Sequence, residues 1–448
     1  MACKVSLQSL LATLIAISVA NNGNGSAQVA GRCIAYVRPA TRIPSALLHV
    51  VPMPAWEQRK ASEVFQIVDD RGHPTLPVLS ATQNQGMIYR DDSGRYIGHD
   101  ESNEIGYKRV LPGDFVVHLR SFQGGFAHSQ YEGITSPAYT VFRAKEPTSH
   151  SDRFWKHWFM SEHFIAGLST VTYGIRDGRS ISVDEFMNTF LAFPAVEEQA
   201  AISRLFDYLD DLITLHQRKY DKLVIFKKSM LEKMFPKDGE SVPEIRFAGF
   251  TDPWEQRKFG DCFEFLKSNT LSRAGLNGEN GTARNVHYGD ILIKFGDCLD
   301  GERSDLPFIT DDTVLPKFAG SILREGDVIF ADTAEDEAAG KCVELRKLPK
   351  EPTISGLHTI PARPRFFFGT GYLGHYLNSD AYHRQLLPLM QGIKVISVSK
   401  AALQDTQVRF PGLSEQAAIG AALSEIDNLI TLHQRKRLSI RQRSPVWS

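Results

Sequence analysis

The hydrophobic residues of this chain follow two different periodicities. Between residues 202 and 234, apolar or aromatic side chains return at intervals of three and four. This spacing is the heptad seam of a coiled coil, sustained over more than four heptads. Pro236 and Gly239, residue types that often follow a helix end, come directly after the run. We therefore expect one long helix, with a seam formed by Ile202, Phe206, Leu209, Ile213 and His216.

The second half of the chain repeats this seam. The octapeptide LITLHQRK stands at residues 212–219 and again at 429–436. The match extends upstream without a gap, so that residues 193–219 align with 410–436, and WEQRK occurs at both 56–60 and 254–258. The second seam consists of Ile419, Leu423, Ile426, Ile430 and His433. A repeat of this length indicates a duplicated unit, in which a variable block precedes a constant helix.

The variable blocks show the period of two that is typical of strands. LPGDFVVHL at 111–119 corresponds to REGDVIFAD at 324–332, and Gly, Pro and Asp bound the alternating runs. The expected fold class is α+β, with two mixed α/β domains that alternate with two long helices. These helices would pair as an antiparallel coiled coil and give the chain a pseudo-twofold internal repeat.

The composition is that of an ordinary globular protein, with 42% hydrophobic and 23% charged residues over 448 positions. The formal net charge of −1 excludes a global basic excess, so a nucleic-acid-binding surface would have to be local. Five cysteines without CxxC spacing indicate neither a disulfide framework nor a zinc site. A cytoplasmic location fits these residues best.

The N-terminal segment differs from the rest. A lysine precedes an apolar run from Leu10 to Ala20, and small polar residues follow, which is the pattern of a secretory signal. The run is too short to span a bilayer. A signal and an irregular extension that is foreign to the rest of the chain both stay open as interpretations.

The order of the shared segments resembles the specificity subunit of type I restriction-modification systems. The resemblance rests on FP with EQ and Ile, on LITLHQRK in both copies, and on KKSMLEKMFP and IRFAGFTDPWEQRK between them, and it covers residues 56 to 436. It implies a non-catalytic subunit whose two variable blocks each read one half of a bipartite, asymmetric DNA sequence. The helices would set the gap and dock two methyltransferase (M) subunits and the restriction (R) subunits. This chain would hold no cofactor; S-adenosylmethionine, ATP and Mg would belong to the partners.

The repeat and the resemblance together predict the domain boundaries. Residues 1–54 would be an atypical N-terminal extension, with disorder as one alternative. Target-recognition domains at 55–192 and 251–409, here the first block and the second block, would alternate with spacer helices at 193–236 and 410–448. Residues 237–250 would link the two halves, and the second helix would have a divergent C-terminus.

Two departures from the pattern leave alternatives open. The first copy reads LLHVVPMPAWEQRK where the second reads IRFAGFTDPWEQRK, and after Lys436 the segment RLSIRQRSPVWS replaces the continuation of the first helix. The chain could therefore be a rearranged, inactive specificity subunit. A structural coiled-coil scaffold without a role on nucleic acid and an independent nuclease or methyltransferase are further alternatives.

Contact with DNA requires Lys or Arg for phosphates and a guanidinium fork or an amide for base edges. Loops bounded by Gly in both blocks carry such side chains. In the first block we predict DNA contacts at Arg90, Arg95, Arg120, Ser121, Gln123 and Gly124. In the second block the predicted contacts are Asn269, Thr270, Ser272, Arg273, Asn277 and Lys294.

No catalytic set or metal-ligand spacing stands out among the fourteen histidines. GTGYLG at 369–374 satisfies the GxGxxG pattern that cradles a pyrophosphate. Its counterpart in the first half, RFWKHWFM, has no glycine. We therefore expect a glycine-rich helix start at this point and not a nucleotide site.

Overall fold

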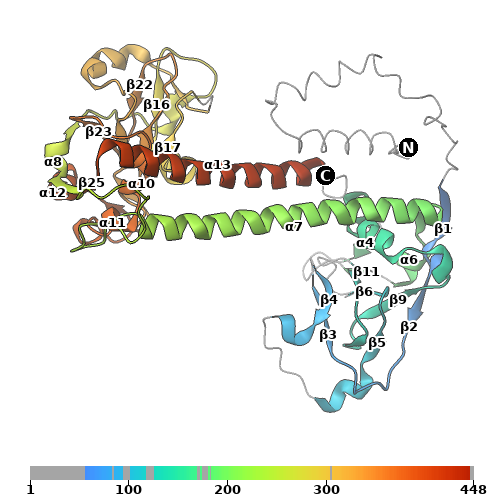
Figure 1. The fold of residues 1–448 in the computed structure, drawn as a ribbon. Coiled ribbons are helices and arrows are strands. Elements are labelled where there is room, and N and C mark those ends of the chain that lie inside the picture. Colours follow the sequence, from blue (N-terminus) through green and yellow to red (C-terminus); the bar gives the residue numbers. More distant parts are fainter. Residues whose placement is uncertain are drawn as a thin grey trace, which may run out of the picture. The chain divides into compact units, whose positions relative to one another are not determined.

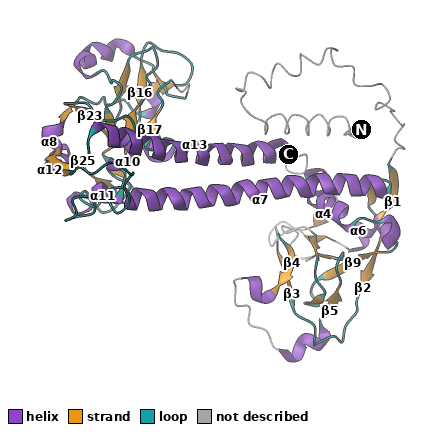
Figure 2. Ribbon diagram, in the orientation of Figure 1, coloured by secondary structure: helices purple, strands orange, loops and turns teal. Residues whose placement is uncertain are grey.

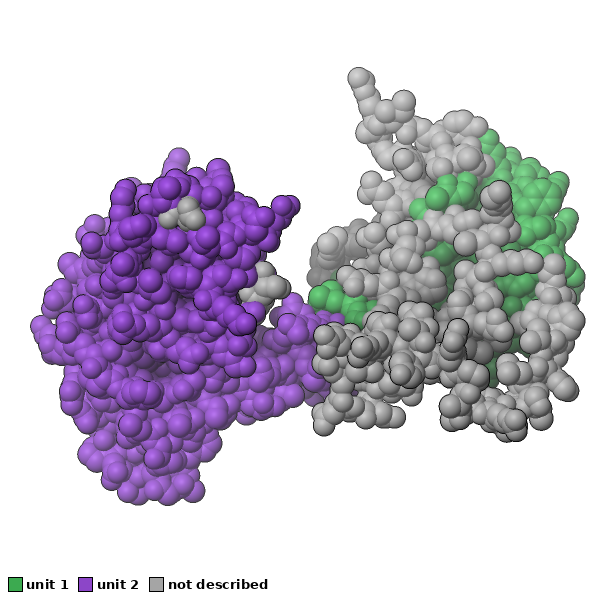
Figure 3. Space-filling model, turned by 90° about the horizontal axis from the view of Figure 1, so that it is seen from above, with its two compact units in different colours: residues 1–214, 437–448 green, residues 215–436 purple. Residues whose placement is uncertain are grey.

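The computed structural model describes residues 56–82, 85–93, 101–117, 126–168, 172–173, 180–181, 183–302 and 305–443. The chain divides into two compact units, one formed by residues 1–214 with 437–448 and the other by residues 215–436 (Figure 3). We call them unit 1 and unit 2. The first block lies in unit 1 and most of the second spacer helix lies with the second block in unit 2. The signal-like stretch lies outside the described residues, and the domain boundaries from the sequence stay predictions.

Unit 1 is built around a four-stranded antiparallel sheet in the order β2-β9-β6-β7. Its strands are β2 (Phe65–Val68), β9 (Thr140–Ala144), β6 (Phe115–Val117) and β7 (Ala127–His128). Smaller antiparallel pairs are β3 (Leu79–Thr82) with β4 (Gly86–Tyr89), β5 (Lys108–Val110) with β8 (Gly133–Thr135), and β10 (Thr172–Tyr173) with β11 (Ser180–Ile181). The helices of the first block are α3 (Ala61–Val64), α4 (Asp152–Met160), α5 (Glu162–Leu168) and α6 (Val183–Asn188), with 3₁₀ turns η2 (Arg90–Ser93), η3 (Glu101–Gly106) and η5 (Pro147–Ser149).

Aromatic side chains hold helix α4 against this sheet. Ser151 caps the helix, because its side chain accepts a hydrogen bond from the amide of Phe154. The ring of Phe65 lies edge-on to Phe115 and to Trp155, with centroids 6.0 and 5.5 Å apart, and all three are buried. Such edge-to-face pairs stabilise a core beyond the area they bury. The core thus fixes where α4 lies on the sheet.

Unit 2 contains two larger sheets. One has five strands in the order β14-β23-β19-β21-β17, and the other has four in the order β15-β18-β16-β22. The strands of the first are β14 (Phe263–Phe265), β23 (Thr359–Pro364), β19 (Val328–Ala331), β21 (Cys342–Leu345) and β17 (Cys298–Leu299). Those of the second are β15 (Leu276–Asn277), β18 (Phe308–Ile309), β16 (Arg284–Val286) and β22 (Thr353–Ser355), and a short pair joins β20 (Thr333–Ala334) to β24 (Ile396–Ser397). The pairs β17–β21 and β16–β22 are parallel, so both sheets are mixed.

Short helices pack around these sheets. They are α8 (Phe259–Cys262), α9 (Tyr288–Ile293), α10 (Tyr372–Leu377), α11 (Asp380–His383) and α12 (Lys400–Asp405), with 3₁₀ segments η7 (Arg273–Gly275), η8 (Asp312–Ser321) and η9 (Leu387–Leu389). All six residues of α10 are buried, and Tyr372 and Tyr376 on it stack with centroids 5.7 Å apart. The strands predicted from residues 324–332 are present as β19, and those predicted from 111–119 are present in part as β6.

Two long helices follow the blocks, as the heptad spacing predicts. They are α7 (Val196–Lys233), which continues unbroken from residues of unit 1 into residues of unit 2, and α13 (Leu413–Arg443) (Figures 1 and 2). Just before each helix, a strand pairs with the strand that opens its block. The pairs are β1 (Glu57–Lys60) with β12 (Phe190–Phe193), and β13 (Glu255–Lys258) with β25 (Gln407–Phe410).

The two blocks share these details although their sequences differ. Glu57 lies opposite Phe193 in β1–β12, and Glu255 lies opposite Phe410 in β13–β25, so the register is the same. In each block an arginine also binds a buried aspartate through two hydrogen bonds, Arg143 with Asp114 and Arg363 with Asp327. The duplication that the sequence indicates therefore extends to individual contacts.

Spacer-helix junctions and candidate nucleic-acid interface

A buried glutamine ties the first block to the start of α7. The side-chain oxygen of Gln199 accepts a hydrogen bond from the amide of Ser151, with a separation of 2.9 Å, and its nitrogen donates to the carbonyl of Pro194. Gln199 has no exposed surface. One side chain thus joins the N-terminus of α4 to the loop before the long helix.

The same arrangement occurs in the second half. The side-chain oxygen of Gln416 accepts from the amide of Gly369 at 2.8 Å, and its nitrogen donates to the carbonyl of Pro411. Gln199 and Gln416 are 217 positions apart, the offset of the sequence repeat (416 − 199). The EQ of the repeated motif is therefore a structural clasp between each block and its helix.

The glycine-rich turn at 369–374 holds an internal carboxylate. The amides of Gly371 and Gly374 donate to the two oxygens of Glu344, at 2.6 and 2.8 Å. Burial raises the pKa of Glu344, although these two hydrogen bonds lower it. A side chain at Gly374 would collide with the carbonyl of Asp297. The N–H groups that would cradle a phosphate in a nucleotide site are thus already engaged, and the glycine makes room for the backbone.

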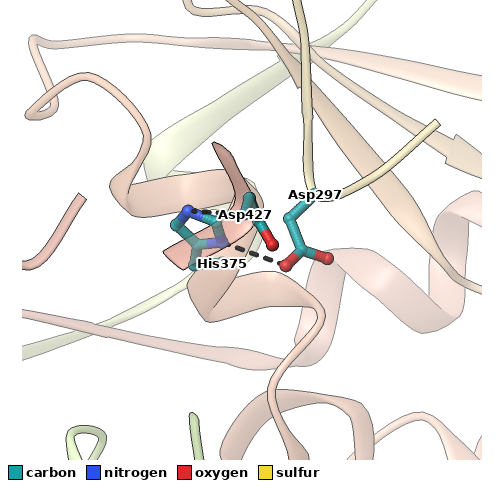
Figure 4. A group of neighbouring side chains, drawn as sticks. All are labelled: Asp297, His375 and Asp427. Atoms are coloured by element: carbon teal, nitrogen blue, oxygen red, sulfur yellow. Dashed lines mark hydrogen bonds and ion pairs between the residues drawn. The ribbon is translucent and has the colours of Figure 1, made fainter. Parts of the chain in front are cut away.

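A cluster of charged side chains lies beside this turn in unit 2. Asp297, His375 and Asp427 point toward one another (Figure 4). Nδ1 of His375 lies 3.0 Å from an oxygen of Asp297, and Nε2 lies 3.9 Å from Asp427. Three such ligand atoms within 4.8 Å of one another could hold a metal ion. The ammonium group of Lys227, however, lies 2.7 Å from Asp297 and 2.5 Å from Asp427, so a cation from the chain itself already neutralises them.

The contacts within this cluster determine the pKa values of its charged groups. Burial by itself would raise the pKa of Asp297, but the hydrogen bond with His375 and the charge of Lys227 outweigh it and lower the pKa to about 2. Burial would likewise lower the pKa of Lys227, and the two aspartates raise it instead. The lysine and Asp297 are therefore both charged across the physiological range, as an ion pair with a hydrogen-bonding histidine.

The seam residues divide between two kinds of contact. On α7, Ile202 packs against the core of the first block, and the ring of Phe206 lies 5.3 Å from that of His157 on α4. On α13, Ile419, Leu423 and Ile426 belong to the core of unit 2, and Ile430 packs against it. The N-terminal part of each seam thus packs against the core of the block that precedes it.

A direct contact between α7 and α13 occurs at the repeated histidines. Nδ1 of His216 lies 2.8 Å from Nδ1 of His433, and both residues belong to unit 2. His216 is buried. Leu209 is buried and Ile213 is half-buried, both on the same seam of α7. The seam positions that the sequence singled out are therefore buried or half-buried, and their role toward partner proteins stays a prediction.

Of the six predicted DNA contacts in the first block, Arg90 lies in the described residues. It opens η2, with its guanidinium carbon 6.0 Å from the ring centroid of Tyr107. The others, Arg95, Arg120, Ser121, Gln123 and Gly124, lie outside the described residues. They stay predictions.

The predicted residues of the second block fall into two groups. Arg273 and Lys294 are about half exposed, at 53% and 48%, and both bind the buried carboxylate of Asp290. Arg273 does so through two hydrogen bonds of 2.8 and 3.0 Å, and Nζ of Lys294 lies 3.1 Å from Asp290. Thr270 and Ser272 are exposed nearby in the sequence.

The two asparagines of the prediction have internal partners. Asn269 is buried, and its amide donates to Asn285 and to the carbonyl of Ser355. The oxygen of Asn277 accepts from the amides of Glu279 and Asn280. Asn269 therefore holds the loop in place, and a base-reading role is disfavoured for it because its donors are engaged. Asn277 shapes a turn and is partly exposed.

Sequence reasoning overlooked Asp290, which orients both cations. Its pKa is lowered because the hydrogen bonds from Arg273 and Lys294 outweigh the effect of burial. Asp290 stands in the run HYGDILIKFGD, where an acidic residue four positions before a lysine on a helix is the one available signal.

An exposed turn at residues 392–395 is a further feature that the sequence patterns do not predict. Gly392 has a φ of 115°, Ile393 is 97% exposed, and Lys394 follows it. The backbone of Gln391 and Ser397 closes this turn with two hydrogen bonds. It presents an apolar and a cationic side chain to the surroundings of the second block.

Within the part of the chain that the structure describes, no helix is long and apolar enough to cross a bilayer.

Comparison with known proteins agrees with the resemblance seen in the sequence. No known protein family profile matches the chain. The type I restriction enzyme MjaVIII specificity subunit of Methanocaldococcus jannaschii is 24% identical over 267 residues, which is 57% of this chain and 59% of that protein. The putative MjaX specificity subunit of the same organism is 19% identical over 411 residues, 86% of this chain and 90% of that protein.

The fold has solved counterparts as well. A chain in a structure that describes complex assembly and conformational transition of the type I R-M system superposes with a TM-score of 0.50 and 17% identity, covering 88% of this chain and 96% of that chain. At this identity the likeness concerns the fold alone. In sequence the chain is thus similar to two proteins named as specificity subunits of type I restriction enzymes, and in fold it is similar to a chain of a type I R-M structure.

Proposed function

We propose that this chain confers DNA sequence specificity on a type I restriction-modification complex. Each block would read one half of a bipartite, asymmetric site, and α7 and α13 would set the gap between the halves. The chain itself would carry no catalytic function. S-adenosylmethionine, ATP and Mg would act in the methyltransferase and restriction subunits that it brings to the DNA.

The duplicated junction is the observation that supports this proposal most. Each block closes with a strand pair in the same register and is clasped by the same glutamine at the start of a long helix. The blocks differ in their sheets, whereas the strand register and the glutamine contacts of the two junctions are the same. This arrangement suits a protein that holds two different DNA-recognition domains through the same type of junction.

The contacts inside unit 2 support an antiparallel pairing of the helices. His216 of α7 contacts His433 of α13, and Lys227 contacts Asp427. From the first contact to the second, residue numbers rise along α7 and fall along α13. A helix pair that runs in opposite directions is the arrangement expected of a spacer with pseudo-twofold symmetry.

In the second block, the surface around Asp290 has the chemistry to contact DNA. The half-exposed guanidinium of Arg273 has N–H donors beyond the two that bind Asp290 and would present these to the edge of a guanine, and Lys294 offers an ammonium for a phosphate. One aspartate between two cations leaves a local positive charge on a chain with a net charge of −1. Local charge of this kind attracts the DNA backbone.

Exposed apolar residues on the long helices suit the docking of partner subunits. On α7 these include Leu215, Val224, Ile225 and Phe226, and on α13 Leu432 and Leu438. Ile225 is 69% exposed, and its sequence neighbours Val224 and Phe226 are exposed as well. Contiguous exposed apolar side chains often mark a site of protein contact. We assign this surface of α7 to the methyltransferase subunits.

Methylated-base sequencing of cells that carry the complete system tests the proposal. We expect methylated adenines in a two-part motif with a fixed gap. Exchange of the first block for that of a relative should change one half of the motif and leave the other intact. A pure scaffold would leave the whole methylation pattern unchanged by the exchange, and an independent enzyme would modify DNA without its partners.

A rearranged, inactive subunit is a second candidate, and one contact favours it. In the second copy, Arg246 binds the buried Glu415 through two hydrogen bonds of 2.7 Å. Glu198 is the counterpart of Glu415, but Leu48 stands at the sequence position that corresponds to Arg246 (246 − 198). Restoration of restriction in a strain that lacks its specificity subunit would exclude this candidate.

A further inference from the structure

A buried ionic network joins the second block to both long helices. Lys227 comes from α7 and Asp427 from α13, whereas Asp297 precedes β17 and His375 lies on α10. All four residues belong to unit 2. Figure 4 shows the two carboxylates, of Asp297 and Asp427, and the imidazole of His375 directed toward one point. Two elements of the spacer and two elements of the block therefore meet through charged groups.

The network is closed by further hydrogen bonds. The side chain of Asn378 donates to Asp297 at 3.0 Å, and Nε2 of His375 lies 3.4 Å from the hydroxyl of Ser424 on α13. Arg346 donates to the same hydroxyl at 3.0 Å. His375 has no exposed surface. Each charge in this region therefore has a partner with a defined direction.

Charged contacts of this kind fix geometry more strictly than the apolar contacts around them. The packing of Leu423 and Ile426 against the core tolerates small shifts, because dispersion and burial depend weakly on direction. A buried ion pair that slides loses its partner and retains the cost of desolvation. The ionic network therefore adds directional contacts to the apolar packing that holds the second block against α7 and α13.

The first block has a comparable contact at the corresponding place. His157 of α4 lies 3.0 Å from Asp207 of α7. By the repeat offsets, His157 corresponds to His375 (157 + 218) and Asp207 to Ser424 (207 + 217), whose hydroxyl group Nε2 of His375 also contacts. Asp210, on the same helix as Asp207, corresponds to Asp427 (210 + 217). Arg153 and Lys156 supply the positive charge there, in place of a lysine from the long helix. A histidine-aspartate contact thus holds a block helix to a spacer helix in both units.

We propose that Lys227, Asp297, His375 and Asp427 are positioning residues that make the protein selective for the gap between the two half-sites. This inference rests on the proposed function. The network acts on the orientation of the second block and touches no base. Its loss should widen the range of accepted gaps without changing which bases the block prefers.

The test uses the full chain assembled with its methyltransferase subunits. Binding is measured to duplexes that carry both half-sites at the native gap and at gaps one base pair shorter and longer. Asp427→Asn removes one of the two negative charges that face Lys227 and keeps the shape of the side chain. Asp405→Asn is the matched control, because Asp405 forms an exposed ion pair with Lys258 outside the network.

We expect Asp427→Asn to reduce the preference for the native gap on the order of tenfold, which is the range of coupling between contacting groups. The effect of a base change inside the second half-site should stay as in the wild type. Asp405→Asn should leave both quantities unchanged. If Asp427→Asn does not fold, Lys227→Arg, which keeps the charge in a group of different shape, takes its place.

The possible results separate the two proposals. A wild-type complex that fails to assemble, or binds without any gap preference, contradicts the proposed function. A folded network variant that keeps the wild-type gap preference overturns the positioning role. A variant that loses the base preference together with the gap preference also overturns it, because the network then only maintains the fold of the block.

Discussion

At the scale of single residues, the second block obtains its cationic surface from a buried acid. Asp290 is 2% exposed at its side chain, yet its pKa is lowered because Arg273 and Lys294 outweigh the effect of burial. The carboxylate holds the guanidinium through two bonds, which limits the rotamers of a long side chain before any ligand arrives. Preorganisation of this sort turns a flexible surface arginine into a directed one.

Arg273→Ala should relax base selectivity in one half of the DNA site. Loss of a guanidinium fork costs about 1–3 kcal/mol of discrimination against the wrong base. Binding by the assembled complex to a panel of duplexes, each with one base changed in the second half-site, measures this. Arg384→Ala is the control, since Arg384 is exposed and pairs with Asp380 on the same short segment. Equal discrimination in both variants would remove Arg273 from the interface.

At the scale of elements, the clasp between each block and its helix depends on one amide side chain. Gln199 and Gln416 are buried and make equivalent hydrogen bonds in the two halves. Truncation would leave the amide of Ser151 or Gly369 without this partner. A buried polar group that loses its hydrogen bond is costly, because water cannot replace the partner.

Gln199→Ala and Gln416→Ala should each lower the free energy of unfolding by about 1–3 kcal/mol, the penalty for a buried unsatisfied group. Gln217→Ala is the control on the same helix as Gln199, because Gln217 is partly exposed and donates to Asp221 one turn further along α7. Its effect should stay within about 0.5 kcal/mol. Urea denaturation of the three variants measures these free energies of unfolding. Equal losses in all three would contradict the clasp.

The histidine contact makes the pairing of α7 with α13 sensitive to acid. Burial lowers the pKa of His216, and the charges of His433, Lys436 and Lys219 lower it further; burial and the two lysines also lower that of His433. In the folded state these two histidines therefore bind protons less readily than they do in the unfolded chain. The stability that this pair contributes is present above pH 6.5, the ordinary histidine pKa, and is lost as the pH falls below it.

The double variant His216→Asn with His433→Asn should remove this part of the pH dependence. Denaturation midpoints at about pH 7.5 and about pH 5.5, on either side of the ordinary histidine pKa, provide the measurement. We expect the wild type to lose more stability between the two conditions than the variant does. An identical loss in both proteins would show that the histidine pair does not titrate in this range.

At the scale of the whole molecule, charge is balanced and attraction to DNA has to be local. The chain has 51 basic and 52 acidic residues, so a long-range field does not favour nucleic acid. Binding would then depend on a small number of phosphate contacts and on the added surfaces of partner subunits. The dependence of affinity on salt reports how many such contacts there are.

Lys294→Ala should reduce the slope of the logarithm of affinity against the logarithm of salt concentration by about 1, the value for one phosphate contact. It should weaken all sequences alike, which distinguishes it from Arg273→Ala. Titrations of the assembled complex with specific and nonspecific duplexes at several salt concentrations provide both quantities. An unchanged slope would place Lys294 away from the phosphates.

The sequence by itself determined the repeat, the two long helices and several strands of each block. Each of these is a local property, because the period of 3.5 at Ile202 to Met234 and the alternation around Phe115 and Val328 describe which faces are buried. The family resemblance came from the same repeated segments. What the periodicity could not distinguish was the partner of each apolar position. Ile202 and Phe206 pack against the first block, although the heptad pattern alone makes them equivalent to His216.

Only the tertiary structure decided which polar residues act together. Asp290 meets Arg273 across 17 positions, and His375 meets Asp297 across 78. Side chains that far apart become neighbours only when strands and helices pack, and no local pattern records such a pairing. Asn269 seemed equivalent to Arg273 in the sequence, yet the fold buries its amide and leaves the guanidinium exposed. Periodicity reports burial along the chain, whereas electrostatic and hydrogen-bond partners depend on the path of the chain in space.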